Sequence, residues 1–127
     1  MCGRLYINDM LGLTVSNRLG LDFPVQQNLD LRPTEKIATL VMHNDTLDQQ
    51  AATWGIQPAW SKTLLINAQA ETVAEKKTFA SAFAHHRCLV PCSGWFEWRG
   101  EDGAKKQKYL FSYEDNEPVY GVHSISQ

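Results

Sequence analysis

Apolar and polar residues alternate along this 127-residue chain in short runs, and turn-forming residues separate one run from the next. Alternation with a period of two is typical of β-strands that bury one face. Asn44 and Asp45 lie between two such runs, which predicts a hairpin at this point. We expect strands at residues 2–7, 35–43, 46–55, 64–68, 88–91, 95–99, 108–113 and 119–126.

Two segments show helical spacing instead. Asn8 or Asp9 can cap a short helix that ends at Gly20. Its apolar residues on one side are Met10, Leu13 and Leu19. A second helix is expected at residues 75–85, with an inward face formed by Phe79, Ala82 and Phe83. Residues 21–33 contain two prolines and little periodicity, so we expect a loop there.

Many short strands combined with two helices are typical of the α+β class. We therefore expect a curled, mainly antiparallel β-sheet or barrel with short flanking helices. A length of 127 residues suits one domain, and no repeat or low-complexity segment interrupts the chain.

Charge and cysteine content narrow the classes of function. The formal net charge is −2, so DNA binding would depend on a local cluster of the 12 Lys and Arg residues. The three cysteines are an odd number, and no segment is typical of a signal peptide or a membrane span. This pattern predicts a cytoplasmic protein with reduced thiols and no membrane partner.

The first four residues, Met1-Cys2-Gly3-Arg4, offer unusual chemistry. Removal of Met1 would leave Cys2 with an α-amine and a thiol, groups whose ordinary pKa values are about 8 and about 8.5. An aminothiol condenses with an aldehyde to an imine, and the thiol then closes a thiazolidine ring. In an extended strand Arg4 lies on the same face as Cys2. On these four residues alone, a start codon followed by an incidental buried cysteine is the favoured interpretation.

Further motifs point to a family. They are Trp54-Gly55-Ile56-Gln57-Pro58-Ala59-Trp60, Asn67-Ala68-Gln69-Ala70-Glu71-Thr72 and Gly94-Trp95-Phe96-Glu97-Trp98. With the N-terminus, they resemble the SRAP (SOS response-associated peptidase) family, whose members begin Met-Cys-Gly-Arg. The family carries W-G-x-x-P-x-W, N-A-R-x-E-T and G-[WF]-[FY]-E-W in this order. The resemblance extends over essentially the whole chain.

The resemblance implies a DNA-damage protein that captures abasic sites in single-stranded DNA without a cofactor. By position, Cys2 is the nucleophile that forms a thiazolidine with the ring-opened sugar. Asn67 would hold the N-terminus or the sugar, and Glu97 would be the general acid/base. Independently of the family, Glu97 shares a strand face with Trp95, and a carboxylate beside an indole is partly desolvated and suited to proton transfer.

The resemblance also implies contacts with DNA, and thus a nucleoid-associated protein when DNA is bound. Arg4, Lys77 and Arg87 are expected to hold phosphates. Trp60 would stack on a base or wedge the strand. Pro33 resembles a residue of the family's loop beside the bound strand.

Three features depart from the family pattern. Gln69 replaces the arginine of N-A-R, and Asp30 replaces an asparagine of an N-x-x-P loop. The family continues into a catalytic histidine after the point that matches Gln127, and His123 is in the wrong element to replace it. We therefore expect residues 1–127 to form the N-terminal portion of an SRAP domain. The strand at 119–126 would then expose an edge that self-associates or binds a partner polypeptide.

Other interpretations stay open. A thiol peptidase would release the residue before Cys2, so that the mature N-terminus is its product. A non-catalytic remnant would keep the fold and bind DNA only. The sequence also groups His85, His86, Cys88 and Cys92, but their spacing is unlike a zinc site, and we expect no metal.

Overall fold

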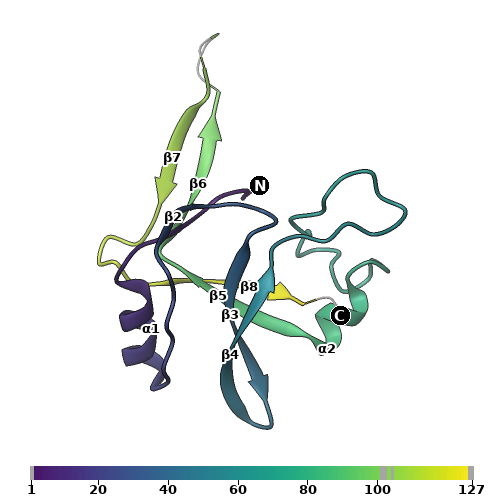
Figure 1. Ribbon diagram of the computed structural model, residues 1–127. Coiled ribbons are helices and arrows are strands. Elements are labelled where there is room, and N and C mark those ends of the chain that lie inside the picture. The colour runs from purple at the N-terminus through teal and green to yellow at the C-terminus, as the bar shows by residue number, and fades with distance from the viewer. Residues whose placement is uncertain (1, 101–102, 104, 126–127) are drawn as a thin grey trace. The chain divides into compact units, whose positions relative to one another are not determined.

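The computed structural model of the chain describes residues 2–100, 103 and 105–125 (Figure 1). Its elements are β1 (Leu5–Ile7), α1 (Leu11–Leu19), β2 (Asn28–Leu31), β3 (Lys36–His43), β4 (Thr46–Thr53), α2 (Ala80–His85), β5 (Arg87–Cys92), β6 (Gly94–Arg99), β7 (Gln107–Phe111) and β8 (Val119–Ser124). They divide between two compact units, Met1–Arg32 with Pro91–Val119 and Pro33–Val90 with Tyr120–Gln127. The α+β class is confirmed, because two four-stranded sheets accompany two short helices.

The first sheet has the strand order β2-β1-β6-β7. β1 pairs antiparallel with both β2 and β6, and β6 pairs antiparallel with β7. β2 lies inside the segment that we predicted to be a loop. That prediction is wrong because β2 is a short strand recognised through its pairing with β1 (Leu5 opposite Leu31) and not through its own periodicity.

Helix α1 belongs to the same unit and buries a different face from the predicted one. Its buried residues are Leu11 and Val15, which are four positions apart on one side of the helix. The residues predicted to face inward, Met10, Leu13 and Leu19, are exposed. Gly12 explains this orientation, because a Cβ there would lie 2.8 Å from the carbonyl oxygen of Phe23. The glycine lets the Phe23 segment pass close to the helix.

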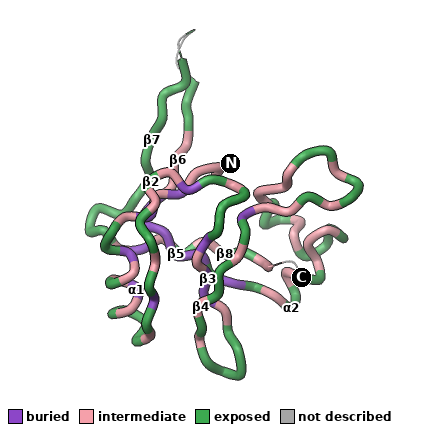
Figure 2. Tube along the Cα trace, viewed as in Figure 1, coloured by how far each residue is buried: buried purple, intermediate pink, exposed green. Residues whose placement is uncertain are grey.

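The second sheet has the order β4-β3-β5-β8. The predicted hairpin is confirmed: β3 and β4 pair from Lys36 opposite Thr53 to His43 opposite Thr46. Asn44 and Asp45 both have positive φ, at 48° and 62°, as a two-residue hairpin turn requires. In Figure 2 the buried residues of this part of the chain follow β3 and β5.

Two other predictions for this unit are wrong. Residues 64–68 form no strand, because only Leu65 makes a β-bridge, with Ile56. The predicted helix at 75–85 is regular only from Ala80 to His85. The preceding residues form hydrogen-bonded turns, such as the one closed by the bond from the Lys76 N–H to the Thr72 oxygen. No helix of the described residues is long and apolar enough to span a membrane.

Strand β8 is the last strand in the order of the second sheet, and its Val122 is 65% exposed. An edge strand with an exposed apolar side chain is a template for another strand. We expect the protein to self-associate through β8 as its concentration rises. Light scattering over a concentration series should show a rising mean mass, and Val122→Lys should suppress the rise. A constant monomer mass in the wild type would refute this expectation. Ser126, in the predicted 119–126 edge, lies outside the described residues.

Candidate functional site

The segment Cys2–Arg4 precedes β1 and is held beside β6. The amide N–H of Phe96 donates to the carbonyl oxygen of Arg4 at 3.0 Å, and the N–H of Ser93 donates to that of Tyr6 at 2.9 Å. The Cys2 thiol turns back to donate to the same Arg4 oxygen, at 3.6 Å. The regular strand therefore starts at Leu5 and not, as predicted, at Cys2. Met1 lies outside the described residues.

The Cys2 thiol is half-buried and lies within the electrostatic influence of Glu97. The pKa of Cys2 is raised above its ordinary value, chiefly because the thiol is half-buried, while its hydrogen bond to Arg4 opposes the shift. The negative charge of Glu97 raises the pKa further. The Glu97 carboxylate and the Cys2 thiol therefore interact electrostatically within the first unit.

Side chains alternate between the two faces of β6, so Glu97 lies on the face opposite to Phe96 and Trp98. Glu97 pairs with Tyr109 and Trp95 with Phe111, so these four share one face of the β6–β7 hairpin. The rings of Trp95 and Phe111 stack at 5.3 Å. The opposite face carries Phe96 and Trp98 from β6, together with Lys108 and Leu110 from β7.

Asp30 in β2 gathers three cations of the first unit. Its oxygens lie 3.2 Å from Arg4 Nε, 2.8 Å from Arg32 Nη2 and 3.8 Å from Lys108 Nζ. The hydrogen bond from Arg32 is the main reason that the pKa of Asp30 is lowered, and the charges of Lys108 and Arg4 contribute. We call these four residues the Asp30 cluster. Sequence reasoning found Arg4 but missed Arg32 and Lys108.

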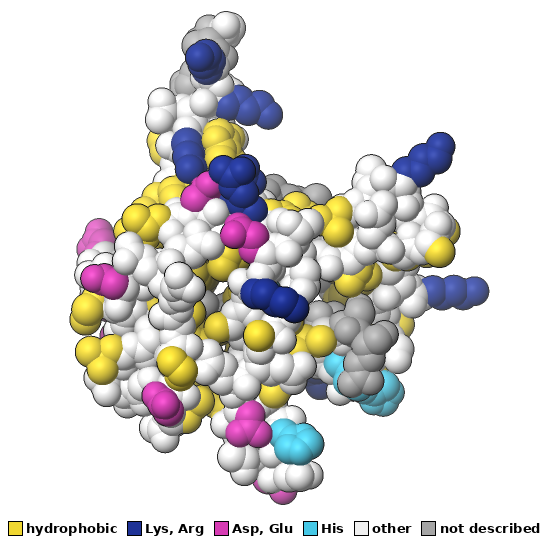
Figure 3. Space-filling model, in the orientation of Figure 1, with side chains coloured by type: hydrophobic (Ala, Val, Ile, Leu, Met, Phe, Trp, Pro, Cys, Tyr) yellow, Lys and Arg dark blue, Asp and Glu magenta, His cyan; other side chains and the backbone are white. Residues whose placement is uncertain are grey.

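The cations of the Asp30 cluster also lie over aromatic rings of β6. Lys108 Nζ is 4.1 Å from the centre of the Phe96 ring and 5.6 Å from that of Trp98. The guanidinium of Arg4 lies 5.7 Å from the Trp98 ring. Figure 3 shows Lys and Arg side chains gathered over the β6–β7 hairpin. Charge and aromatic surface are therefore combined on one face of the first sheet.

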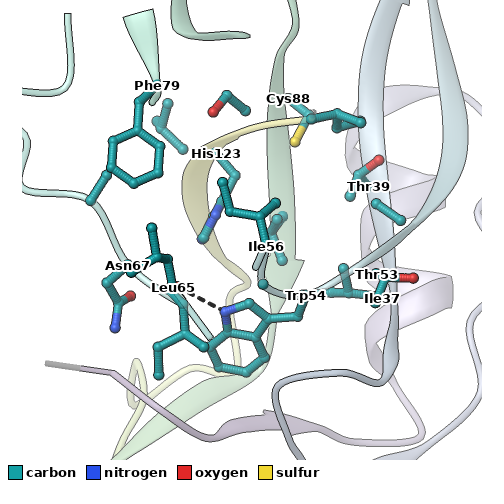
Figure 4. A pocket seen from close by; sticks show the side chains of 18 of the residues that line it. Ile37, Thr39, Thr53, Trp54, Ile56, Leu65, Asn67, Phe79, Cys88 and His123 are labelled. Atoms are coloured by element: carbon teal, nitrogen blue, oxygen red, sulfur yellow. Dashed lines mark hydrogen bonds between the residues drawn. The ribbon is translucent and has the colours of Figure 1, made fainter. Parts of the chain in front are cut away.

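Asn67 belongs to the second unit, where it lines a cavity of about 570 Å³ (Figure 4). Two bonds fix the segment before it: the Trp54 indole N–H donates to Ile66 O at 2.9 Å, and Leu65 N–H donates to Ile56 O at 2.7 Å. Apolar side chains, among them Phe79, form most of the wall, and Asn67 supplies an amide.

The other predicted residues of the second unit lie in separate places. Trp60 is 70% exposed and its ring is accessible. Lys77 is exposed in the turns before α2, and Pro33 lies in a turn before β3. Arg87 begins β5, and its guanidinium lies 5.4 Å from the Phe83 ring. Cys2, Arg4 and Glu97 thus belong to the first unit, where the charge of Glu97 acts on the Cys2 thiol, while the remaining predicted residues are in the second.

Cys88 and Cys92 are buried thiols of β5. Burial raises the pKa of each to about 11, so both are protonated at neutral pH. The rings of His85 and His86 are 6.4 Å apart, edge to face. Within the described ranges, no group of three or more His, Cys, Asp or Glu side chains has the arrangement of a metal site.

Replacing Glu97 with glutamine should lower the pKa of the Cys2 thiol, because the substitution removes the negative charge that helps to raise it. Alkylation of Cys2 should therefore accelerate at a lower pH than in the wild type. Mass spectrometry of the tryptic peptide ending at Arg4 isolates this thiol from Cys88 and Cys92. Glu114→Gln, which removes an exposed carboxylate of the same unit, is the matched control. Identical pH profiles for both variants would show that Glu97 does not act on Cys2.

Comparison with known proteins places the chain among its relatives. It is 34% identical over 92 residues to abasic site processing protein YedK of Escherichia coli, covering 72% of this chain and 41% of YedK. It is 27% identical over 116 residues to abasic site processing protein YoaM of Bacillus subtilis, covering 84% of this chain and 51% of YoaM. The chain thus spans about half the length of the curated relatives it matches.

Solved structures share the fold. A phage-related protein from Bordetella bronchiseptica superposes with a TM-score of 0.77 at 21% identity, over 95% of this chain and 59% of that one. A protein from Bacteroides thetaiotaomicron gives a TM-score of 0.73 at 23% identity, over 95% and 58%. The family model described as "SOS response associated peptidase (SRAP)" matches residues 1–122. The chain therefore belongs to the SRAP family.

Proposed function

We propose that this chain recognises abasic sites in single-stranded DNA and bonds to them covalently through Cys2. Membership of the SRAP family supports the proposal, as do relatives whose names describe abasic site processing. The observation that carries it is the half-buried Cys2 thiol with the Glu97 carboxylate acting on it. Together with the α-amine of Cys2, a thiol, a carboxylate and nearby cations are the groups needed to capture an aldehyde on a phosphate-bearing strand.

The reaction requires the α-amine of Cys2, and therefore the prior removal of Met1. The amine adds to the aldehyde carbon of the ring-opened sugar, and the resulting carbinolamine loses water to give an imine. The thiol sulfur then adds to the imine carbon, and the thiol proton goes to the nitrogen. One C–N and one C–S bond form, and one water molecule leaves. The product is a thiazolidine, a closed ring that resists hydrolysis better than the imine.

Glu97 would move the protons in this sequence. Because the pKa of the Cys2 thiol is raised, the thiol is largely protonated at neutral pH, and ring closure needs a base. The Glu97 carboxylate can take that proton, and as the acid it can assist the departure of water from the carbinolamine. The raised pKa also leaves only a small fraction of the Cys2 thiol ionised at neutral pH. A thiol peptidase attacks with the thiolate, so the raised pKa favours the aminothiol reaction over a thiol peptidase mechanism.

Recognition of the DNA would combine charge with stacking. In this proposal Arg4 holds a phosphate next to the lesion. By family resemblance, Asn67 orients the sugar or the N-terminus, Lys77 and Arg87 neutralise further phosphates, and Trp60 stacks on a base. Pro33 would shape the loop beside the strand.

Intact mass spectrometry after incubation with single-stranded DNA containing one abasic site tests the proposal. We expect a species with the mass of the Met1-free protein plus the DNA, minus one water, that survives heating. The same oligonucleotide without the abasic site should give no such species. Loss of Met1 without a DNA adduct would instead indicate the peptidase, and non-covalent binding alone would indicate a binding module. Either result would overturn covalent capture.

A further inference from the structure

We propose that one face of the first sheet holds the undamaged strand that flanks the lesion, and that Asp30 occupies the position of a backbone phosphate until DNA binds. We call it the aromatic–cation face; it is formed by the Asp30 cluster together with Phe96 and Trp98. The inference rests on the proposed function for the class of ligand, single-stranded DNA. It adds the place where that ligand lies and a contact within the protein that competes with it.

The strand order assembles this face from β2, β6, β7 and the segment before β1. Asp30 comes from β2, Arg4 from the residue before β1, Trp98 from β6 and Lys108 from β7. Trp98 and Lys108 are direct partners in the β6–β7 ladder, so their side chains project on the same side. Ion pairs and ring contacts connect these four residues on one face of the sheet.

The composition of this face suits a single strand of nucleic acid. Trp98 is 41% exposed, and Lys108 and Arg4 lie over its ring at 5.6 Å and 5.7 Å. Proteins that bind single strands without sequence preference combine cations for the phosphates with aromatic rings for the bases. Arg99, Lys105 and Lys106 are exposed towards the end of the same hairpin and extend the positive charge.

Asp30 has the features of a phosphate substitute. Three cations surround this one carboxylate, so the cluster carries excess positive charge even with Asp30 ionised. Arg32 directs both Nε and Nη2 to a single oxygen, Oδ2, at 3.0 and 2.8 Å. The other oxygen, Oδ1, is enclosed but accepts no hydrogen bond from the residues that the structure describes. A phosphate offers more oxygens to the same donors and would satisfy them more completely.

The ion pairs of Asp30 are also weak enough to exchange. The side chains of Arg4, Arg32 and Lys108 are 30%, 60% and 43% exposed, so water and salt screen their attraction to the carboxylate. DNA would displace Asp30 from these cations without breaking a buried ion pair. The carboxylate then opposes binding of any strand, and the lesion contributes affinity that an undamaged strand lacks.

Fluorescence anisotropy with an undamaged oligothymidine tests the inference, because this probe has no aldehyde and cannot crosslink. Asp30→Asn should tighten binding by about 3- to 10-fold at low salt and steepen the salt dependence, since three cations become available to phosphates. Asp48→Asn makes the same charge change at an exposed position of β4 and should have little effect. Equal affinities for these two variants would overturn the competing role of Asp30.

The surface itself is tested by removing its cation and its ring. Lys108→Ala and Trp98→Ala should each weaken binding of oligothymidine several-fold, whereas Lys36→Ala, on an exposed position of β3, should not. Lys108→Gln keeps most of the side-chain packing and removes only the charge, so a loss of binding in this variant cannot be attributed to misfolding. Wild-type affinity in Lys108→Gln and in a folded Trp98→Ala would refute the surface. Because covalent capture is measured separately on abasic DNA, either proposal can fail while the other stands.

Discussion

Replacing Cys2 with serine is expected to abolish the heat-stable adduct with abasic DNA. The α-amine of serine still forms an imine, but its hydroxyl closes an oxazolidine ring, which hydrolyses readily. Adduct yield after heating should therefore fall to the background of an undamaged strand, while borohydride should trap the imine in both proteins. Denaturing gel electrophoresis with and without borohydride distinguishes these outcomes.

Two controls sharpen this experiment. Cys88→Ala and Cys92→Ala should keep full crosslinking, because both thiols are buried, have a pKa of about 11 and lack an adjacent α-amine. A protein that retains Met1 should give no stable adduct, since the nitrogen of Cys2 is then an amide. Equal crosslinking with and without Met1 would exclude the thiazolidine mechanism.

Gly94→Ala should produce the largest loss of stability among conservative changes near the site. A Cβ at this buried position would collide with the carbonyl oxygen of Phe111, and it would lie 3.1 Å from Leu110 Cδ1. Either β7 must move away from β6 or the chain must shift at Ser93. Strain of this kind typically costs about 1–3 kcal/mol of the free energy of unfolding, which urea denaturation measures.

The matched variant is Gly100→Ala at the end of β6, where an added Cβ meets no heavy atom within 4 Å. It should leave the denaturation midpoint nearly unchanged. A distorted hairpin would also move Glu97, so Gly94→Ala should alter the pH profile of Cys2 alkylation as well. If both glycine variants unfold at the same urea concentration, the close approach of β6 and β7 at Gly94 does not limit the fold.

The sequence predicts those elements whose signals are local. The β3–β4 hairpin follows from alternation on both sides of a turn whose two residues tolerate positive φ. Strand β2 and the buried face of α1 depend instead on partners distant in the chain, Leu5 for the strand and Phe23 for the helix. Periodicity within a segment carries no information about such partners, so pairing and close packing override it.

The residues of the candidate site also differ in whether a local signal in the sequence marks them. Cys2 and Glu97 could be chosen from the sequence because motifs mark both, and the negative charge of Glu97 contributes to the raised pKa of the Cys2 thiol. Asp30 was recognised only as a departure from a pattern. Its contact with Arg32 is local, two positions along the chain, whereas its contacts with Arg4 and Lys108 depend on the strand order, which no local signal encodes.

The division into two units has a consequence for synthesis on the ribosome. Each unit combines an early segment with a late one, so the chain passes between them near residues 32, 90 and 119. Strands β1 and β2 must wait for β6 and β7 before their sheet is complete, and the β3–β4 hairpin must wait for β5 and β8. Neither unit can complete its sheet until its own late strands, β6 and β7 or β5 and β8, have been translated, in contrast to proteins whose domains fold in turn from the N-terminus. The nascent chain therefore exposes unfinished sheet edges until β7 and β8 emerge, which makes it a candidate substrate for chaperones that act at the ribosome.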